Sequence, residues 1–394
     1  MTGSTNPDRQ GAVAEPAPAR LPDLPQLQRW AAALGFSSLG SPRLTLSHEV
    51  RSGLRAWLAA GMHGEMDYMA RHERLRGHPE ELMPGAVSAL MVTLDYTPSA
   101  PHWRDHAWST IADGRRAFVA RYALGRDYHK VVRQRLQRLA DRIGEAIGPF
   151  GYRAFCDSAP VMEVELATRA GLGWRGKHTL LIGRRRGSMS FIGTLYTDLP
   201  LAEQTPEPDR CGRCSRCIDV CPTRAIIAPY RLDARRCIAY LTIEHAGSIP
   251  EALRPLIGNR IFGCDDCQLV CPWNKFAQPS TVSDFAPRHG LDSALLIDLF
   301  AWDEATFTER TAGSPIRRIG HERWLRNLAV AIGNADPRSS DERARLLAAL
   351  SLRETHPSAV VREHVVWAID QLRREAKRLS PSSDQGDPER QCKR

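Results

Sequence analysis

The chain has 394 residues, enough for two or three domains, and its 42% hydrophobic and 25% charged residues are ordinary for a globular protein. No stretch reaches the roughly 18 apolar residues of a membrane span, and residues 1–20 lack the apolar core of a secretion signal, so we expect a cytoplasmic protein with no membrane contact. The net charge of +9 suits a protein that meets a polyanion, although many basic proteins bind no nucleic acid.

The first large domain is expected over residues 24–201, after an Ala/Pro-rich tail, residues 1–23, which we expect to be disordered. Apolar residues recur three or four positions apart in residues 26–34 and again in residues 127–147. This spacing places the apolar side chains on one face of a helix. Both segments are therefore predicted to be amphipathic helices.

Strand patterns alternate with these helices. Residues 87–96 (VSALMVTLDY) form a continuous apolar run typical of a buried strand. Residues 179–182 and 189–196 flank a turn at residues 184–187 and predict a hairpin. Helices mixed with strands indicate an α/β or α+β domain within an α+β protein.

Two stretches mix glycine, aromatic residues and cations where strands meet helices. They are RYALGRDYH, which ends at His129, and GLGWRGKH, which ends at His178. Such mixtures line ligand pockets, but turn glycines beside a solvated face explain them equally well. The second stretch also matches G-x-G-x-x-G, but it follows a helical pattern and precedes a strand, so it does not support a dinucleotide site.

Asp157 is the best candidate for a proton donor. It stands in CDSAPVME, where apolar neighbours could desolvate the carboxyl and raise its pKa. The competing interpretation is a helix cap, with Pro160 in the first turn, and a capping carboxylate has a lowered pKa. From the residues alone, the helix cap is the favoured interpretation.

Eight of the ten cysteines lie between Cys211 and Cys271, within residues 202–287, and form two runs. CGRCSRCIDVCP has the C-x2-C-x2-C-x3-C-P spacing of bacterial ferredoxins, and CDDCQLVCP repeats it with its first cysteine displaced to Cys237. Thiols in the cytoplasm are kept reduced, so the array indicates metal and not disulfides. We expect a ferredoxin-like domain with two [4Fe–4S] clusters.

In two-cluster ferredoxins, the cysteine before proline binds the other cluster. The rule assigns the cluster ligands as follows: cluster one takes Cys211, Cys214, Cys217 and Cys271, and cluster two takes Cys221, Cys237, Cys264 and Cys267. Structural zinc is the alternative, because four-cysteine zinc sites also use C-x2-C pairs. Zinc explains neither the third cysteine of the first run nor the proline after each run.

Residues 288–379 have helical patterns that resemble a HEAT-type repeat, in which paired helices stack into an extended surface. One segment, SPIRRIGHERWLRN, combines several arginines with a tryptophan. A polar tail follows at residues 380–394, which we expect to be disordered.

Several long motifs resemble those of the epoxyqueuosine reductase family. They are DSAPVMEVELATRAGLGWRGKHTLLI, RYALGRDYH, the two cysteine runs, RRCIAYLTIEH and GNRIFGCDDCQLVCPWN, and the resemblance covers residues 24–369. It implies a cobalamin in the domain of residues 24–201, next to one cluster. The clusters would reduce the cobalamin, and the epoxide of epoxyqueuosine at the tRNA wobble position would become an alkene. This is the last step of queuosine formation.

The resemblance also implies site residues. Asp157 matches the family's proposed proton donor, which reverses the preference for a helix cap, since a carboxyl between corrin and substrate could stay protonated. We expect cobalamin contacts from six residues: Asp157, Ser158, Lys177, His178, Ser188 and Asp265. The cobalamin-ligand motif D-x-H-x-x-G is missing, because Asp127-Tyr-His129 continues Lys-Val-Val, so no dedicated histidine for cobalt is visible.

With a tRNA substrate, the basic C-terminal segment gains a role. Arg317, Arg318, Arg323 and Arg326 could contact phosphates of an anticodon stem-loop, although an ordinary solvated helix face is an equal alternative. An external electron donor such as a flavodoxin or ferredoxin is expected, and nothing demands more than a monomer.

Three rival interpretations stay open. A reductive dehalogenase shares the cluster half, but such enzymes usually carry a twin-arginine signal, and the early arginines here are isolated. A pure ferredoxin-type electron carrier is disfavoured by the large domain before the clusters. A zinc-containing tRNA-binding protein would lack iron and sulfide.

Overall fold

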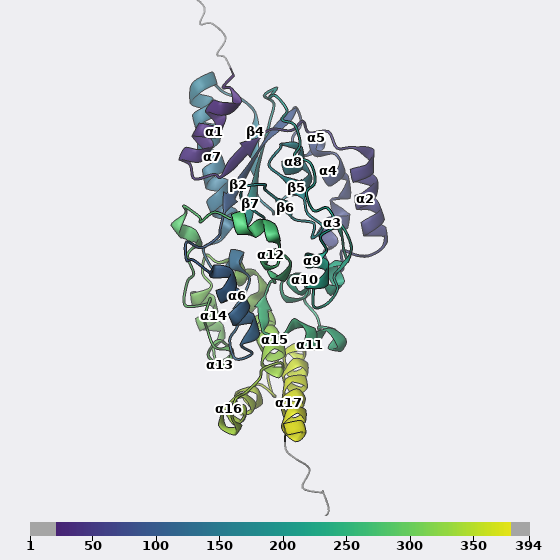
Figure 1. Cartoon of the computed structure of the whole chain (residues 1–394), viewed down its shortest axis with the longest axis vertical. Helices are drawn as coiled ribbons and strands as arrows, with labels where there is room; N and C mark the ends of the chain where they lie inside the picture. The colour runs from purple at the N-terminus through teal and green to yellow at the C-terminus, as the bar shows by residue number, and fades with distance from the viewer. Residues whose placement is uncertain (1–20, 380–394) are drawn as a thin grey trace, which may run out of the picture.

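The computed structural model describes residues 21–379 (Figure 1). The tails expected at residues 1–23 and 380–394 lie, apart from residues 21–23, outside the described residues. The molecule is elongated, with the sheet near one end and the long C-terminal helix near the other. None of its described helices is both long and apolar enough to span a bilayer.

A four-stranded antiparallel sheet organises the first half of the chain. Its strands, in spatial order, are β1 (Ser38–Gly40), β2 (Ser88–Asp95), β7 (Ser190–Thr197) and β4 (Tyr152–Phe155). All eight residues of β2 are buried, as the predicted strand requires. The antiparallel pairing and the mixture of helices and strands confirm the α+β class.

Alternation along β2 explains why both faces of the sheet are covered. Leu90, Val92 and Leu94 pack in one apolar cluster, and Ala89 and Met91 pack in another on the opposite face. Successive side chains of a strand point to opposite faces, so a strand that is buried throughout needs helices on both sides.

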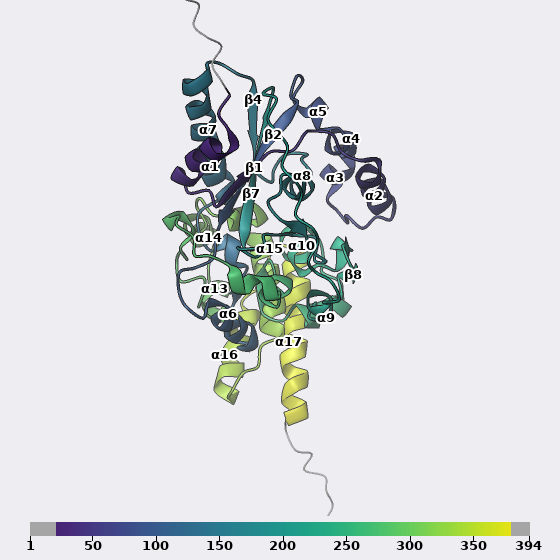
Figure 2. The ribbon, with the colours of Figure 1, turned by 45° about the horizontal axis from the view of Figure 1, so that its top comes forward.

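Helices α1 (Leu24–Ala33) and α7 (Tyr128–Ile147) supply one cover, and α8 (Glu163–Arg169) supplies the other (Figure 2). The apolar faces of α1 and α7 are those that the sequence predicts, with Leu27 and Leu136 buried. Asp23 caps α1 by accepting the backbone N–H of Gln26 at 2.8 Å. Both helix predictions are therefore confirmed.

The predicted hairpin around residues 184–187 is wrong. Strand β6 (Leu181–Ile182) pairs with β5 (Trp174–Arg175), whereas β7 belongs to the large sheet. Only an isolated bridge, Gly183 to Gly187, closes the turn. A side chain at Gly173 would collide with the backbone oxygen of Ile182, so the close β5–β6 pairing explains this glycine.

Short elements make up the rest of the first half. They are α2 (His48–Ala59), α3 (Asp67–Arg71), α4 (Glu73–Gly77), α5 (Pro79–Leu82), α6 (Trp103–Ala112) and β3 (Phe118–Val119). Helices α2 to α5 lie beside α8 on the same side of the sheet (Figures 1 and 2). They form one wall of the site described below.

The cysteine-rich segment folds as loops around very short elements. These are α9 (Arg216–Asp219), β8 (Ile226–Ala228), β9 (Arg231–Leu232), α10 (Ile238–Ile243), α11 (Arg254–Ile257), β10 (Arg260–Phe262) and α12 (Asp266–Leu269). Strand β10 pairs in parallel with β3, which joins this segment to the first half.

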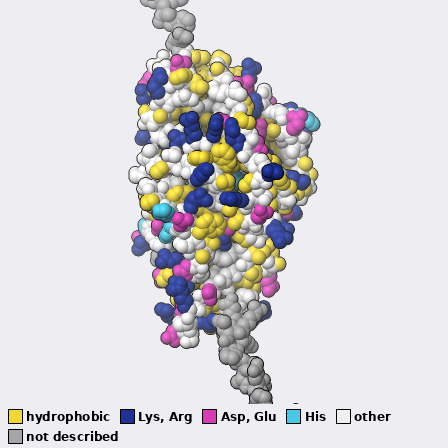
Figure 3. Space-filling view, in the orientation of Figure 1, with side chains coloured by type: hydrophobic (Ala, Val, Ile, Leu, Met, Phe, Trp, Pro, Cys, Tyr) yellow, Lys and Arg dark blue, Asp and Glu magenta, His cyan; other side chains and the backbone are white. Residues whose placement is uncertain are grey.

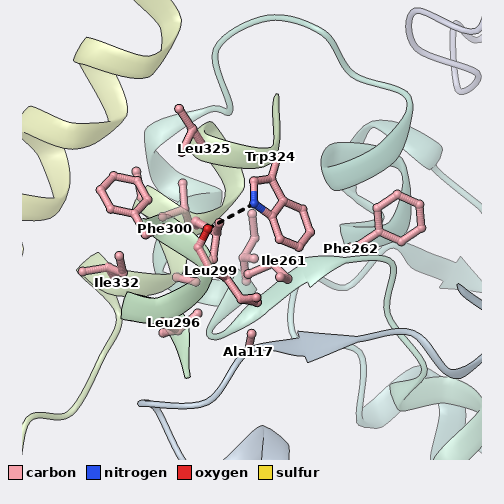
Figure 4. Packing of buried hydrophobic residues seen from close by; sticks show 14 of the residues in the cluster. Ala117, Ile261, Phe262, Leu296, Leu299, Phe300, Trp324, Leu325 and Ile332 are labelled. Atoms are coloured by element: carbon pink, nitrogen blue, oxygen red, sulfur yellow. Dashed lines mark hydrogen bonds between the residues drawn. The ribbon is translucent and has the colours of Figure 1, made fainter. Parts of the chain in front are cut away.

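The C-terminal part is helical, as predicted. It contains α13 (Leu296–Phe300), α14 (Glu304–Arg310), α15 (Gly320–Gly333), α16 (Ser340–Ser351) and α17 (Ala359–Leu379). Its core is shared with earlier segments, because Trp324 packs with Ile261 and Ala117 and donates to Leu299 O at 3.3 Å (Figure 4). The HEAT-like character and the domain boundaries stay predictions.

Candidate active site

Four thiols from the two cysteine runs influence one another electrostatically. Cys271, from the second run, lies within electrostatic range of Cys211 and Cys214, from the first. Burial and then the charges of Cys271, Cys211 and Cys214 raise the pKa of Cys217 to about 11. These four residues are those assigned to cluster one.

The remaining thiols form a second group, whose four members are all partly exposed. Cys237 has Cys221 as a charged neighbour, Cys267 has Cys237, and Cys264 has Cys267. Burial raises the pKa of Cys237, Cys264 and Cys267, so these thiols need a strong positive centre to bind as thiolates. Within residues 21–379, no three His, Cys, Asp or Glu side chains are arranged to hold a single metal ion.

Lys177 and Trp174 lie against the loop of the first thiol group. The Lys177 Nζ donates to Gly212 O at 2.6 Å and to Cys214 O at 2.9 Å. Burial raises the pKa of Cys211, while the Lys177 backbone N–H and the Trp174 indole act in the opposite direction. Donors around a cluster sulfur favour its thiolate form. Lys177 therefore holds the cluster loop.

His178 offers a free donor in the same stretch. Its side chain is buried, and this burial lowers its pKa to about 4, so the ring is neutral. Nδ1 accepts the backbone N–H of Leu180 at 3.2 Å, which leaves the proton on Nε2. Nε2 is buried and has no partner. A buried donor without a partner is costly, which makes this N–H a candidate for binding a cofactor.

Asp157 does not cap a helix, because α8 begins only at Glu163. Its φ is +59°, a left-handed conformation that is uncommon outside glycine. Its Oδ2 accepts a hydrogen bond from the Tyr128 hydroxyl and lies 3.3 Å from His129 Nε2. Its backbone N–H donates to Glu163 Oε1 at 2.7 Å. A strained loop thus presents the carboxylate, and the helix-cap interpretation is wrong.

Two carboxylates hold His129 as a cation. Its Nδ1 lies 2.8 Å from Asp127 Oδ1, and its Nε2 faces Asp157. Burial opposes the charge, but these hydrogen bonds and charges raise the pKa of His129 to about 9. Burial also acts to raise the pKa of Asp157, but His129 and Tyr128 lower it. In this state Asp157 is ionised and His129 carries the proton.

A cavity of about 810 Å³ opens beside this group. The Asp157 side chain is 55% exposed. Burial, and next the charge of Asp157, raise the pKa of Glu163 to about 8. Arg76 is buried, donates to Val161 O at 3.3 Å and leaves its Nε without a partner. The lining includes Trp57, Met69, Arg76, Val161, Met162 and Glu163.

The six residues expected to contact cobalamin are all outside the lining of this cavity. Ser188 is buried and bonds Asn274, and its oxygen accepts from Gln268. Asp265 is buried and accepts the backbone N–H of Arg121 at 2.6 Å. Sequence reasoning missed Arg76 and Glu163, because a single charged residue on a short helix carries no pattern.

Two of the predicted tRNA contacts are on the surface. Arg317 and Arg318 are exposed, and Arg318 pairs with Glu244 at 2.8 Å. Arg318 also contributes to the lowered pKa of Asp157. Figure 3 shows Lys and Arg side chains gathered around an apolar hollow on one face. Such a rim suits a phosphate backbone around an apolar site.

Arg326 cannot make the predicted phosphate contact. It is fully buried in α15, and its guanidinium donates to Leu241 O, His245 O, Gly247 O and Asn327 Oδ1. Arg323 is half-buried and donates to Ile319 O and Ile243 O. The prediction for Arg326 is wrong, because the helical pattern of α15 alone could not separate a core cation from a surface one.

Comparison with known families identifies two segments. Residues 210–274 match the model of a 4Fe-4S double cluster binding domain. Residues 76–158, which contain Arg76, the Tyr128–His129 pair and Asp157, match the model described as epoxyqueuosine reductase QueG, DUF1730. The two matches cover the thiol groups, Asp157 with its partners Tyr128 and His129, and Arg76 of the cavity lining.

Curated relatives match almost the whole chain. The epoxyqueuosine reductase of Alicycliphilus denitrificans is 57% identical over 352 residues, which is 88% of this chain and 98% of the relative. That of Escherichia coli is 49% identical over 347 residues, 88% of each chain. A crystal structure of epoxyqueuosine reductase with an epoxyqueuosine-modified tRNA-Tyr stem loop has a TM-score of 0.77 at 28% identity, covering 88% of this chain and 89% of that one. This chain belongs to the epoxyqueuosine reductase family.

Proposed function

We infer that this chain reduces the epoxide of epoxyqueuosine at the wobble position of tRNA, which completes queuosine. The inference rests on family membership and on one feature of the site. That feature is the strained Asp157, which Tyr128 and His129 bind and whose backbone N–H donates to Glu163, a residue of the cavity lining. A carboxylate held in an uncommon backbone conformation is typical of a functional group.

The double-cluster domain supplies the electrons. We propose the crossed ligand sets, with cluster one bound by Cys211, Cys214, Cys217 and Cys271 and cluster two by Cys221, Cys237, Cys264 and Cys267. The grouping of the thiols supports this assignment. Because Cys217 and Cys267 also influence each other electrostatically, the two clusters would lie close enough for electron transfer.

We propose that cobalamin binds in the cavity beside Asp157. The residues present fit such a group, because Arg76, which lines the cavity, has a buried Nε donor without a partner and a corrin carries many amide acceptors. The wall is otherwise largely apolar, as a large ring requires. When bound, cobalamin supplies a low-valent cobalt centre for reduction of the epoxide. Ser158, Lys177, His178, Ser188 and Asp265 are outside this lining and stay proposed contacts.

Asp157 is the proposed proton donor. Conversion of an epoxide to an alkene and water consumes two electrons and two protons, so a group near the leaving oxygen must deliver protons. Asp157 is half exposed, so a substrate oxygen could reach its Oδ2. The pocket excludes bulk water once a substrate fills it, which strengthens each of these contacts.

The proposed macromolecular substrate is a tRNA anticodon stem-loop. A related enzyme has been crystallised with such a stem loop. Arg317 and Arg318 are exposed and remain the proposed phosphate contacts, with a smaller role for the half-buried Arg323. We further propose an external flavodoxin or ferredoxin as electron donor, a monomeric state, and a cytoplasmic location because tRNA is the substrate.

Anaerobic turnover tests the proposal. Purified chain with reconstituted clusters is incubated with epoxyqueuosine tRNA and a chemical reductant, with and without added cobalamin, and the nucleosides are identified by mass spectrometry. We expect queuosine only with both cobalamin and reductant. Product in the absence of cobalamin would reject the cofactor, and no product in any arm would reject the activity.

A further inference from the structure

The arrangement around Asp157 poses a problem for a proton donor. A carboxylic acid can donate only when it is protonated, yet the Asp157 carboxylate accepts hydrogen bonds from Tyr128 and faces the charged ring of His129. Both neighbours favour its ionised form. The proton that the reaction needs therefore resides next to Asp157, not on it.

His129 is built to store that proton. Its Nδ1 is fixed by Asp127 Oδ1 at 2.8 Å, and the same oxygen accepts the His129 backbone N–H at 3.1 Å. Asp127 is the N-cap residue of α7, so the ring is anchored to a long, well-packed helix. Nε2 then points at Asp157 Oδ2, 3.3 Å away. The order carboxylate, imidazole, carboxylate is a proton-transfer chain.

Resting on the proposed function, we propose that His129 supplies the protons that Asp157 delivers to the substrate oxygen. The Nε2–H bond of His129 breaks and an O–H bond forms at Asp157 Oδ2. Asp157 then passes that proton to the epoxide oxygen as the carbon–oxygen bond breaks. Neutral His129 regains a proton from solvent and repeats the transfer, so two protons reach the oxygen that leaves as water. The electrons come from the clusters.

The groups around His129 are consistent with this role. Asp127 and Asp157 face its two nitrogens, and the Tyr128 ring stacks on it with centroids 4.1 Å apart. Glu163, which bonds the backbone of Asp157, and Arg318 act on the pair from further away. Since His129 acts through Asp157, it is a positioning residue and not a catalytic one.

The test is single turnover of prereduced enzyme with epoxyqueuosine tRNA across a range of pH. In the native protein, the rate should hold as pH rises until His129 loses its proton, at a pKa of about 9. In His129→Gln, Asp157 must take its proton from solvent. The rate should then fall at least about tenfold at neutral pH. The pH above which the rate declines, called the upper limb of the profile, should move below neutrality.

Asp127→Asn and a matched control sharpen the experiment. Asp127→Asn removes one charge that holds the imidazolium, so the upper limb should shift to lower pH by less than in His129→Gln. His102→Gln is the control, because His102 also pairs with a carboxylate, Asp105 at 3.3 Å, but is 83% exposed. Its profile should match the native one. A native profile in His129→Gln would overturn the proposal.

The pH dependence of the melting temperature needs neither cofactor nor substrate. It therefore tests the charge on His129 independently of the proposed activity. The pKa of His129 is raised on folding, so its charge stabilises the fold below about pH 6.5, and that stabilisation is lost as pH rises through about 9. The melting temperature of His129→Gln should fall below the native value by more at pH 6 than at pH 10. An equal difference at both would show that His129 is not held charged, whether or not the enzyme turns over.

Discussion

At the scale of single residues, the backbone of Asp157 decides what its side chain can do. In the left-handed conformation, its carboxylate turns away from α8 and toward the start of α7. Glu163 Oε1 accepts the backbone N–H of Asp157 at 2.7 Å, and this bond holds the loop in place. At a helix cap, the carboxylate would instead accept hydrogen bonds from backbone N–H groups of the first turn.

Asp157→Asn should separate binding from chemistry. The amide is nearly isosteric and can still bond Tyr128, so cobalamin affinity, followed by absorption spectroscopy, should change little. An amide cannot transfer a proton, so turnover should fall by about a hundredfold or more. Turnover within a few-fold of the native rate would remove Asp157 from the chemistry.

Tyr128→Phe should have a smaller effect than Asp157→Asn. The change removes one donor to Asp157 Oδ2 and leaves the ring, which stacks on Phe191 with centroids 4.3 Å apart. The Asp157 pKa should rise, because a bond to its ionised form is lost. We expect a loss in turnover of about tenfold or less, since one such bond contributes about 1.5 kcal/mol. A loss equal to that of Asp157→Asn would instead make Tyr128 the donor.

At the scale of elements, periodic segments could be predicted and short ones could not. The helices at residues 26–34 and 127–147 and the strand at residues 87–96 have long apolar patterns, and the structure has α1, α7 and β2 there. β6 has only two residues, so its partner is decided by β5 and by the close approach at Gly173. Local spacing does not contain that information.

Arg326 shows the same limit within a helix. It lies between Leu325 and Asn327, where a surface cation looks identical in sequence to a buried one. In the folded protein, α10 and the following loop cover Arg326, and its guanidinium donates hydrogen bonds to their backbone carbonyls. Only the structure distinguishes this residue from Arg317 on the adjoining turn.

Arg326→Ala should therefore destabilise the protein. The change leaves several buried carbonyl groups without donors, so we expect a loss of about 3 kcal/mol or more in the free energy of unfolding, measured by denaturant titration. Arg317→Ala is the control: it should leave stability unchanged within about 0.5 kcal/mol and weaken tRNA binding. Full stability of Arg326→Ala would place its guanidinium on the surface after all.

At the scale of the whole molecule, the candidate site is assembled from segments far apart in the chain. The charge of Asp157 acts on Arg76 and that of Arg318 acts on Asp157, although each comes from a different part of the sequence. The cysteine spacing and the family resemblance predicted the thiol groups and Asp157. The cavity wall and the proton-storing role of His129 could not be predicted, because they depend on how α2 to α8 pack around the sheet.

The crossed pairing of the cysteines is the property of the whole molecule that is easiest to test. In the crossed arrangement, each cluster takes ligands from both runs. The number of clusters that a double Cys→Ser variant loses should therefore depend on which cluster each cysteine binds, and not on the run to which it belongs. The native protein should hold about eight irons, and Cys211→Ser with Cys271→Ser should leave about four, because both residues serve cluster one. Cys264→Ser with Cys271→Ser should leave close to none, because these residues serve different clusters.

Iron and sulfide analysis of anaerobically purified protein gives these counts. Cys156→Ala is the control, since Cys156 is buried beside Asp157 and belongs to neither thiol group. It should keep about eight irons. Uncrossed ligation predicts the reverse for the two double variants: four irons without Cys264 and Cys271, and none without Cys211 and Cys271. That reversed result would mean that each run closes its own cluster, and Cys271 would then not tie the two runs together.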